Sequence, residues 1–215
     1  MKPEVIKILD DLLKRFEDLM PIKEPLLEAF HCLDECYRQG GKVLICGNGG
    51  SAADSEHIAG ELMKGFMLKR PLPQEEFDRI KAAFPDDEKA TLMAKNLQGA
   101  LPAIPLVNHT SLTSAVSNDT SADMIYAQQV YGYGKPGDVL LVISTSGTAA
   151  NITNAVIVAK AFGLKSIGLT GGTGGDLPVL CDITLIAPAV ETYRIQEYHL
   201  PIYHTLCAML EREWF

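Results

Sequence analysis

The chain has 215 residues, of which 47% are hydrophobic and 21% charged, a composition typical of a globular protein with a large core. Its formal net charge of −8 argues against a nucleic-acid surface, because phosphate backbones are bound by clustered Lys and Arg. The N-terminal residues mix acids with apolar residues, which predicts no signal peptide, and no apolar run approaches membrane length. The five cysteines are scattered and odd in number, which favours reduced thiols. The sequence therefore predicts a cytoplasmic protein that binds neither nucleic acid nor membrane.

Two helices are predicted over residues 1–40. The second runs from Lys23 to Arg38 and is followed by glycines that suit a helix end. The first has an apolar face with spacings of four and three, formed by Val5, Leu9, Leu12, Phe16 and Leu19. That face packs either on the rest of its own chain or on another subunit, and the pattern favours neither.

Short apolar runs then alternate with helical stretches. The runs predicted to be strands are KVLIC (42–46), AIPLVN (103–108), DVLLVIS (138–144), KSIGLT (165–170) and ITLIAP (183–188). Strands that alternate with helices are typical of parallel βαβ units. The predicted fold class is therefore α/β, a three-layer sandwich whose mainly parallel central sheet is flanked by helices, in one domain over residues 1–215. Ligands are expected at the carboxyl ends of the strands.

Residues 67–103 fit this pattern poorly, because they contain four prolines and mixed charges. Within them PQEEFDRIKAAF and KATLMAKNL are predicted to form short helices. We interpret the segment as an elaboration between core elements, either a surface insertion or a lid.

Two loops share one physical character. GNGGS (47–51) and STSGT (144–148) each leave a predicted strand and open a helix. Glycines let the backbone approach a ligand closely, and the free N–H groups of a helix start attract an anion. Neither loop has the ending of a Walker A motif or a dinucleotide fingerprint. The two hydroxyl-rich loops together predict a sugar-phosphate site, although one such loop alone is often only a turn and a helix cap.

Residues that handle protons or bind metals gather in two segments. His57 and Glu61 share a helix face at i,i+4, which suits a metal site, a proton-transfer pair or a solvent-facing hydrogen-bonded pair. In RIQEYHLPIYH, Gln196 and His204 lie about 80° and 12 Å apart on a helix. His199 points to the other side of Gln196 and is predicted either to support the site from behind or to have a packing role.

Together the motifs GNGGSAADSEHIAGEL, SND (117–119), STSGTAAN and RIQEYH...H resemble the sugar-isomerase (SIS) domain family. Within it they are most similar to the sedoheptulose 7-phosphate isomerases, also called phosphoheptose isomerases. The similarity covers the chain except 67–103, which is longer than the family's usual connection. It implies an aldose–ketose isomerase of sugar phosphates, a homotetramer with active sites at subunit contacts, in which the N-terminal helices serve oligomerisation.

The resemblance also implies roles for individual residues. Positions matching Glu61 and His204 act as base and acid through an enediol. One zinc ion per subunit is held by positions matching His57, Glu61, Gln196 and His204. The substrate is held by positions matching Asn48, Gly49, Gly50, Ser51, Glu61, Asn118, Asp119, Ser144, Thr145, Ser146 and Gln196.

The chemistry agrees with these implied roles. Moving a proton between adjacent carbons needs a base, an acid and a positive group for the developing oxyanion. A glutamate bound tightly to zinc is a poor base, so Glu61 either moves or ligates through one oxygen. Ser51 and Glu61 lie ten residues apart on one helix, a rise of about 15 Å, which favours a site completed by a neighbouring subunit.

Two further positions depart from the family pattern. Ala149 stands where serine is common, a lost hydroxyl contact worth about 1 kcal/mol, and Tyr193 stands where aspartate is common. These departures bear on the identity of the sugar more than on the reaction. The alternative function is a non-catalytic family member that binds a phosphosugar or a protein such as a replication initiator. A dehydrogenase is disfavoured, because the dinucleotide fingerprint is missing.

Overall fold

The computed structural model describes residues 1–85 and 87–215. Its strands are β1 Val43–Gly47, β2 Ala103–Pro105, β3 Val139–Ile143, β4 Lys165–Gly171 and β5 Ile183–Ala187. Its α-helices are α1 Pro3–Arg15, α2 Lys23–Arg38, α3 Gly50–Met63, α4 Gln74–Ala83, α5 Glu88–Asn96, α6 Thr110–Asp119, α7 Ile125–Tyr133, α8 Ala150–Ala161, α9 Leu177–Leu180 and α10 Thr192–Trp214. Two 3-10 segments are η1 Glu17–Ile22 and η2 Ala122–Met124. All five predicted strands and the second N-terminal helix are confirmed.

The five strands form one wholly parallel sheet in the order β2-β1-β3-β4-β5. Val43 of β1 pairs with Ala103 on one side and with Val139 on the other. The chain therefore leaves β1 toward one edge and returns at β3 to continue toward the other edge. Such a change of direction opens a crevice at the carboxyl ends of β1 and β3, the kind of place where ligands of α/β sheets bind.

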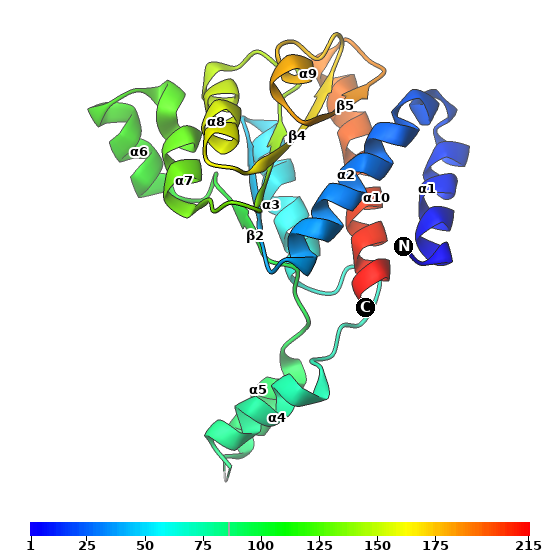
Figure 1. Cartoon of the computed structure of the whole chain (residues 1–215), viewed down its shortest axis with the longest axis vertical. Coiled ribbons are helices and arrows are strands. Elements are labelled where there is room, and N and C mark those ends of the chain that lie inside the picture. The colour runs from blue at the N-terminus through cyan, green and yellow to red at the C-terminus, as the bar shows by residue number, and fades with distance from the viewer. Residues whose placement is uncertain (86) are drawn as a thin grey trace.

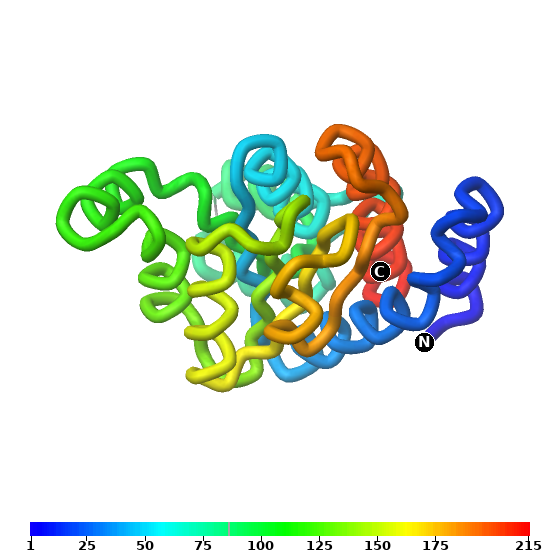
Figure 2. The backbone as a smooth tube through the Cα atoms, turned by 90° about the horizontal axis from the view of Figure 1, so that it is seen from above, coloured from blue at the N-terminus to red at the C-terminus, as the bar shows by residue number. Residues whose placement is uncertain are grey.

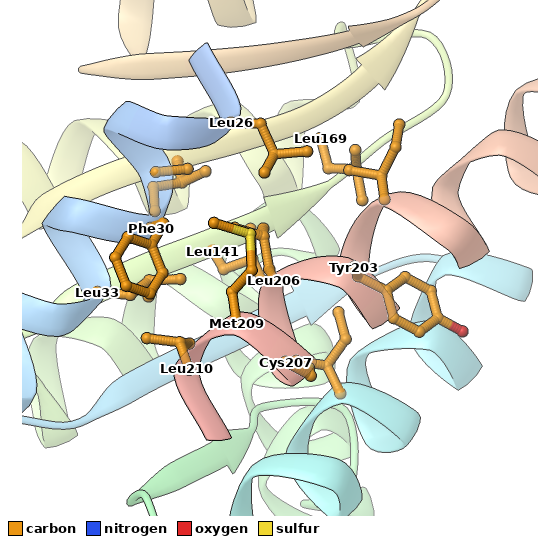
Figure 3. Packing of buried hydrophobic residues seen from close by; sticks show 14 of the residues in the cluster. Leu26, Phe30, Leu33, Leu141, Leu169, Tyr203, Leu206, Cys207, Met209 and Leu210 are labelled. Carbon is orange, nitrogen blue, oxygen red and sulfur yellow. The ribbon is translucent and has the colours of Figure 1, made fainter. Parts of the chain in front are cut away.

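Helices cover both faces of this sheet. Side chains alternate along a strand, so Val43 and Ile45 face one buried cluster while Leu44 and Cys46 face another. The first cluster contains residues of α1, α2, α3 and α10, and the second contains residues of α7 and α8. Figure 2 shows α7 and α8, green to yellow, on the opposite side of the molecule from the blue α1 and the red α10. Figure 3 shows the first cluster where α2 and α10 meet over the strands, with Leu26, Phe30, Leu33, Leu141, Leu169, Leu206, Met209 and Leu210. The predicted three-layer α/β sandwich is thus confirmed.

The apolar face of the N-terminal helix packs inside its own chain. Val5, Leu9, Leu12 and Leu19 are all fully buried, and α1 lies along α10. This face is therefore not free to contact another subunit. The helix is also shorter than the pattern predicts, because the backbone leaves helical geometry at Phe16 and Leu19 lies in η1.

The long helix α10 is fastened to the sheet near its start. The buried ring of His199 lies with Nε2 3.2 Å from the carbonyl oxygen of Thr170, at the end of β4. Burial lowers the pKa of His199 to about 4, so the ring is neutral at physiological pH. The packing role predicted for His199 is confirmed.

Residues 72–97, within the predicted insertion, form an arm that projects from the body of the molecule, whereas Arg70 and Leu101 on its two flanks are buried in the body (Figure 1). Its two helices, α4 and α5, pack against each other and confirm both predicted helices. The helix α4 buries none of its described residues, and the arm joins the body where Pro71 and Gln98 form an antiparallel bridge. Among the helices that the structure describes, none combines the length and apolar character needed to cross a membrane.

Candidate functional site

The two hydroxyl-rich loops lie side by side at the carboxyl ends of neighbouring strands. The first follows β1 and the second follows β3, and Gly47 pairs with Ile143 at the strand ends. The side-chain amides of Asn48 and Asn151 exchange two hydrogen bonds of 2.9 Å between the two segments. The loops therefore border the crevice where β1 and β3 diverge, as the sequence predicts.

Glycine geometry shapes both loops. Gly49 has φ +57° and is exposed directly before the first turn of α3. Gly147 has φ +69°, and a Cβ there would lie 1.9 Å from the carbonyl oxygen of Gly174. Because L side chains rarely adopt such backbone angles, glycine is needed at both positions. Gly49 thus exposes backbone at the start of α3, whereas Gly147 is buried where the second loop packs closely on Gly174.

The hydroxyl groups of the second loop are partly used within it. Ser144 Oγ accepts a hydrogen bond from the backbone N–H of Gly147 at 3.1 Å, and Ser146 Oγ accepts one from that of Thr148 at 3.3 Å. Thr145 lies between them, and Ser51 in the first loop is buried. These hydrogen bonds hold the second loop in shape. The hydroxyl groups of Ser144 and Ser146 each accept one bond in the loop and keep a proton with which they can donate another.

A polar cluster of His57, Glu61 and His204 joins α3 to α10. His57 Nε2 lies 3.1 Å from Glu61 Oε1 and 3.5 Å from His204 Nε2. Glu61 Oε2 also accepts a hydrogen bond of 3.1 Å from Lys64. Three groups that the sequence predicts to handle protons are therefore brought together within one chain.

The environment of His204 favours its neutral form. Burial lowers the pKa of His204, and the nearby ring of His57 acts in the same direction. The ring of Phe66 also covers His204, with ring centroids 5.3 Å apart. A neutral imidazole can donate a hydrogen bond to a carbonyl oxygen and accept a proton in return.

Gln196 lies apart from this cluster. Its amide is so close to the start of α3 that a Cβ on Gly50 would lie 2.4 Å from Gln196 Nε2. Gly50 precedes His57 by seven residues, a helical rise of about 10 Å. Gln196 thus lies beside the phosphate-type loop, and its predicted role as a metal ligand with His57, Glu61 and His204 stays a prediction.

The predicted substrate residues Asn118 and Asp119 lie at the exposed end of α6. Asn118 Nδ2 donates a hydrogen bond of 2.9 Å to Asp119 Oδ1. The helix packs on α7 and η2, yet none of its described residues is buried. The structure does not bring this pair to the His57 cluster within one chain.

The cluster has the donor set of a zinc site. Two imidazoles and one carboxylate are common zinc ligands, with bonds of about 2.0–2.2 Å. A tetrahedron with such bonds has edges of about 3.3 Å, and the separations of 3.1 and 3.5 Å bracket that length. Among the described residues, however, no group of three or more His, Cys, Asp or Glu forms a preformed metal site. The residue types fit zinc, and a metal would have to draw them together.

Other residues of the site were missed by sequence reasoning. Behind His57, the hydroxyl of Tyr203 lies 3.0 Å from Nδ1, and it donates to Asp54 Oδ1 at 3.3 Å. Burial raises the pKa of Asp54, an effect that Tyr203 and His57 oppose. Asp54 lies three residues before His57 on α3, and Tyr203 directly precedes His204; this proximity was the only sequence signal for either residue.

A buried ion pair fastens the two helices just beyond the cluster. Arg70 Nε lies 2.7 Å from Glu211 Oε1, and the two side chains are 0% and 1% exposed. The other guanidinium nitrogens donate to the carbonyl oxygens of Glu61 and Leu62 at 2.9 and 2.7 Å. Arg70 therefore caps the end of the helix that carries His57 and Glu61, while Glu211 belongs to the helix that carries His204.

Comparison with known proteins gives consistent matches. The SIS domain model matches residues 7–82 and 87–171. A phosphoheptose isomerase of Trichlorobacter lovleyi is 36% identical over 216 residues, covering 100% of this chain and 96% of the relative. A phosphoheptose isomerase of Clostridium acetobutylicum is 40% identical over 209 residues, covering 97% of this chain and 88% of the relative.

Solved structures agree with these sequence matches. A phosphoheptose isomerase from Francisella tularensis has a TM-score of 0.73 at 29% identity, over 99% of this chain and 100% of that chain. The phosphoheptose isomerase from Neisseria gonorrhoeae has a TM-score of 0.71 at 31% identity, over 97% and 94%. The similarity therefore extends over essentially the whole chain.

Proposed function

The chain belongs to the SIS domain family, and on that premise we propose that it is a phosphosugar aldose–ketose isomerase of the phosphoheptose isomerase type. We propose sedoheptulose 7-phosphate as the ketose and D-glycero-D-manno-heptose 7-phosphate as the aldose. The observation that carries the proposal is the convergence of Glu61, His57 and His204 on one side of the α3–α10 pair. A non-catalytic phosphosugar-binding protein has no chemical need for such a cluster.

Glu61 is the base in this proposal and His204 is the acid. Glu61 takes the proton from carbon, and His204 supplies a proton to the neighbouring oxygen as the enediol forms. The lowered pKa of His204 suits a neutral donor. The two oxygens of Glu61 contact different partners, Lys64 and His57, so one oxygen can remain held while the other reacts.

We propose that the substrate phosphate binds at the loops after β1 and β3. Their exposed backbone and hydroxyl groups offer donors to an anion, and the first loop opens α3 at its positive end. Gln196, on α10, lies against Gly50 at the start of α3, where it can contact the sugar chain. The predicted substrate residues Asn48, Gly49, Ser51, Thr145 and Ser146 all belong to these two loops.

We propose zinc as the cofactor, held by His57, Glu61 and His204. Gln196 stays the predicted fourth donor, although within one chain it lies beside Gly50 at the other end of α3. When bound, zinc supplies positive charge for the developing oxyanion. The donor types and the pair separations in the cluster support this assignment. Five free cysteines agree with a reducing compartment, and we place the protein in the cytoplasm.

We also propose a homotetramer whose active sites are completed across subunit contacts. Two features support it. The phosphate loop and Glu61 lie at opposite ends of α3, and α6, which carries Asn118 and Asp119, buries none of its described residues within the chain. An interface variant shown by sedimentation to be a monomer is expected to be inactive, and full activity in that monomer would contradict the proposal.

The direct test is to incubate the protein with sedoheptulose 7-phosphate, with zinc or with a chelator, and to detect the heptose aldose. We expect Glu61→Gln and His204→Gln each to abolish turnover and to retain sugar-phosphate binding. Wild-type rates in either variant would remove the catalytic assignment. Binding without turnover by the wild-type protein would favour the non-catalytic alternative.

A further inference from the structure

A chain of hydrogen bonds lies behind His57, on the side away from Glu61 and His204. Asp54 Oδ1 accepts from the hydroxyl of Tyr203 at 3.3 Å, and that hydroxyl lies 3.0 Å from His57 Nδ1. On the other side of the ring, Nε2 lies 3.1 Å from Glu61 Oε1. The imidazole is thus held between two carboxylates, one of which acts through a tyrosine.

Packing keeps this chain in place. Asp54 and His57 are three residues apart on α3 and share a face of the helix. Tyr203 reaches across from α10 and is 1% exposed, with its hydroxyl end turned toward α3 (Figure 3). Its ring meets that of His57 edge-on, with centroids 5.6 Å apart and planes at 74°.

Counting protons shows that only two of the three links can form at one time. Three links are available, from Asp54 to Tyr203, from Tyr203 to His57 and from His57 to Glu61. A tyrosine and a neutral imidazole bring only two protons to these links. If the imidazole proton is on Nε2, the tyrosine proton goes either to Nδ1, which leaves Asp54 without a donor, or to Asp54, which leaves Nδ1 and the tyrosine oxygen 3.0 Å apart with no proton between them. If it is on Nδ1, both inner links form and the link to Glu61 is lost.

Only the arrangement with the imidazole proton on Nδ1 keeps both links on the partly buried side of the ring. Among the described residues, Tyr203 is the only side-chain or backbone donor to Asp54 within hydrogen-bond distance, whereas Glu61 also accepts from Lys64. Asp54 is partly buried, so losing its donor is costly. The link from Nε2 to Glu61 is exposed, so water can replace it at little cost, whereas the links on the Nδ1 side are partly buried.

We propose that Asp54 and Tyr203 are positioning residues that keep the proton of neutral His57 on Nδ1 and thereby present Nε2 as an electron-pair donor toward Glu61 and His204. The ligand class that such a nitrogen takes is a divalent cation, such as zinc, or an acidic hydroxyl of the substrate. The inference deepens the proposed function and rests on it, because it concerns His57 as a member of that site.

The test is the ¹⁵N NMR spectrum of histidine-labelled, chelator-treated protein at about pH 8, well above the usual histidine pKa. The His57 signals are assigned by their loss in His57→Gln. We expect the wild-type ring to carry its proton on Nδ1, and Tyr203→Phe to move it to Nε2, where it can bond to Glu61. A wild-type proton on Nε2, or an unchanged tautomer in Tyr203→Phe, would overturn the proposal.

Three further measurements complete the design. Tyr198→Phe is the matched control, because it removes another hydroxyl that donates to a carboxylate, Asp18, from the same helix, and it should leave the His57 tautomer unchanged. Asp54→Asn keeps the shape and removes the charge; it should shift part of the population to Nε2, and it decides the question if Tyr203→Phe does not fold. Zinc affinity, measured by chelator competition, should fall about 10–100-fold in Tyr203→Phe and not in Tyr198→Phe.

These readouts separate the inference from the proposed function. The tautomer is measured without substrate or metal, so a protein that failed to isomerise sugar phosphates would still give the result. An active isomerase with the proton on Nε2 would refute the inference alone.

Discussion

The α3–α10 junction and the α4–α5 arm both contain an arginine paired with a glutamate, but the two pairs differ in burial. At the junction, Arg70 and Glu211 are 0% and 1% exposed and 2.7 Å apart. On the arm, Arg79 and Glu75 are 75% and 85% exposed and 3.2 Å apart. The same pair of residue types therefore acts as a fixed connection in one region and as a solvated surface pair in the other.

This difference indicates that the α3–α10 junction is the more rigid of the two regions and the better support for a chemical site. Glu211 accepts hydrogen bonds from the backbone N–H groups of Phe66, Met67 and Leu68 in addition to Arg70. Every polar atom of the pair that faces the interior is thus satisfied, which is the condition for a buried network to rigidify a structure. The His57 cluster lies on the two helices that this network joins, and the arm carries none of it.

The largest expected effect comes from breaking the buried pair. Arg70→Met leaves Glu211 buried without its cation and removes a donor from the helix-end carbonyls of Glu61 and Leu62, of which Leu62 keeps the backbone N–H of Leu101. The free energy of unfolding should therefore fall by about 3–5 kcal/mol. Arg79→Met, the same change on the arm, should alter it by less than about 0.5 kcal/mol. Urea unfolding of both variants measures the difference. If both variants lost the same free energy of unfolding, burial would not explain the difference between the two ion pairs.

The second effect is a loss of folding stability at acidic pH. The pKa of buried His199 is about 4 in the folded chain, below its unfolded value of about 6.5, so the unfolded state binds more protons between these values. Stability is therefore full above about pH 6.5 and declines as the pH falls toward 4, by about 3 kcal/mol from this group.

His199→Gln tests that expectation, because its amide can still donate to the carbonyl of Thr170 but does not titrate. Denaturant unfolding at pH 7 and pH 4.5 should show a smaller loss in the variant than in the wild-type protein. The same loss in both would assign the acid sensitivity to other groups.

Local sequence patterns predicted most of the fold. The strand-forming runs, the second N-terminal helix and both helices of the arm are determined by periodicity and by glycines and prolines nearby, and all were confirmed. The pairing of His57 with Glu61 follows from helical spacing alone. Leu19 was wrongly placed on the first helix, because periodicity does not reveal the backbone break at Phe16.

The residue pairs that support the site, Arg70 with Glu211 and Asp54 with Tyr203, could not be predicted from local sequence patterns. Arg70 and Glu211 are 141 residues apart, and Tyr203 and Asp54 are 149 apart. Neither pair has a spacing that marks it, since a buried pair is defined only once two helices have packed. Family resemblance predicted the residues that we propose to carry the chemistry, and the structure was needed to find the residues that hold them.

A smaller effect should come from strengthening the packed body. Ala149 is the N-cap of α8, with backbone angles suited to a capping residue, but its side chain caps nothing. Ala149→Ser adds an oxygen able to accept from a free N–H of the first turn and should raise the free energy of unfolding by about 1 kcal/mol. Urea unfolding without ligand measures this gain. An unchanged midpoint would mean that the hydroxyl points into the crevice, where only substrate affinity would report it.

The smallest effect is expected from removing the arm. Residues 72–97 can be replaced by a short Gly-Ser linker, because Pro71 and Gln98 already lie side by side as a bridge. The arm's buried residues Ala90 and Ala94 lie on α5, whose packing partner is α4, so little core is lost with it. The free energy of unfolding should therefore change by less than about 0.5 kcal/mol. Turnover should also persist, because the cluster and both loops lie in the body; a lid, by contrast, would lower kcat and raise KM with stability intact.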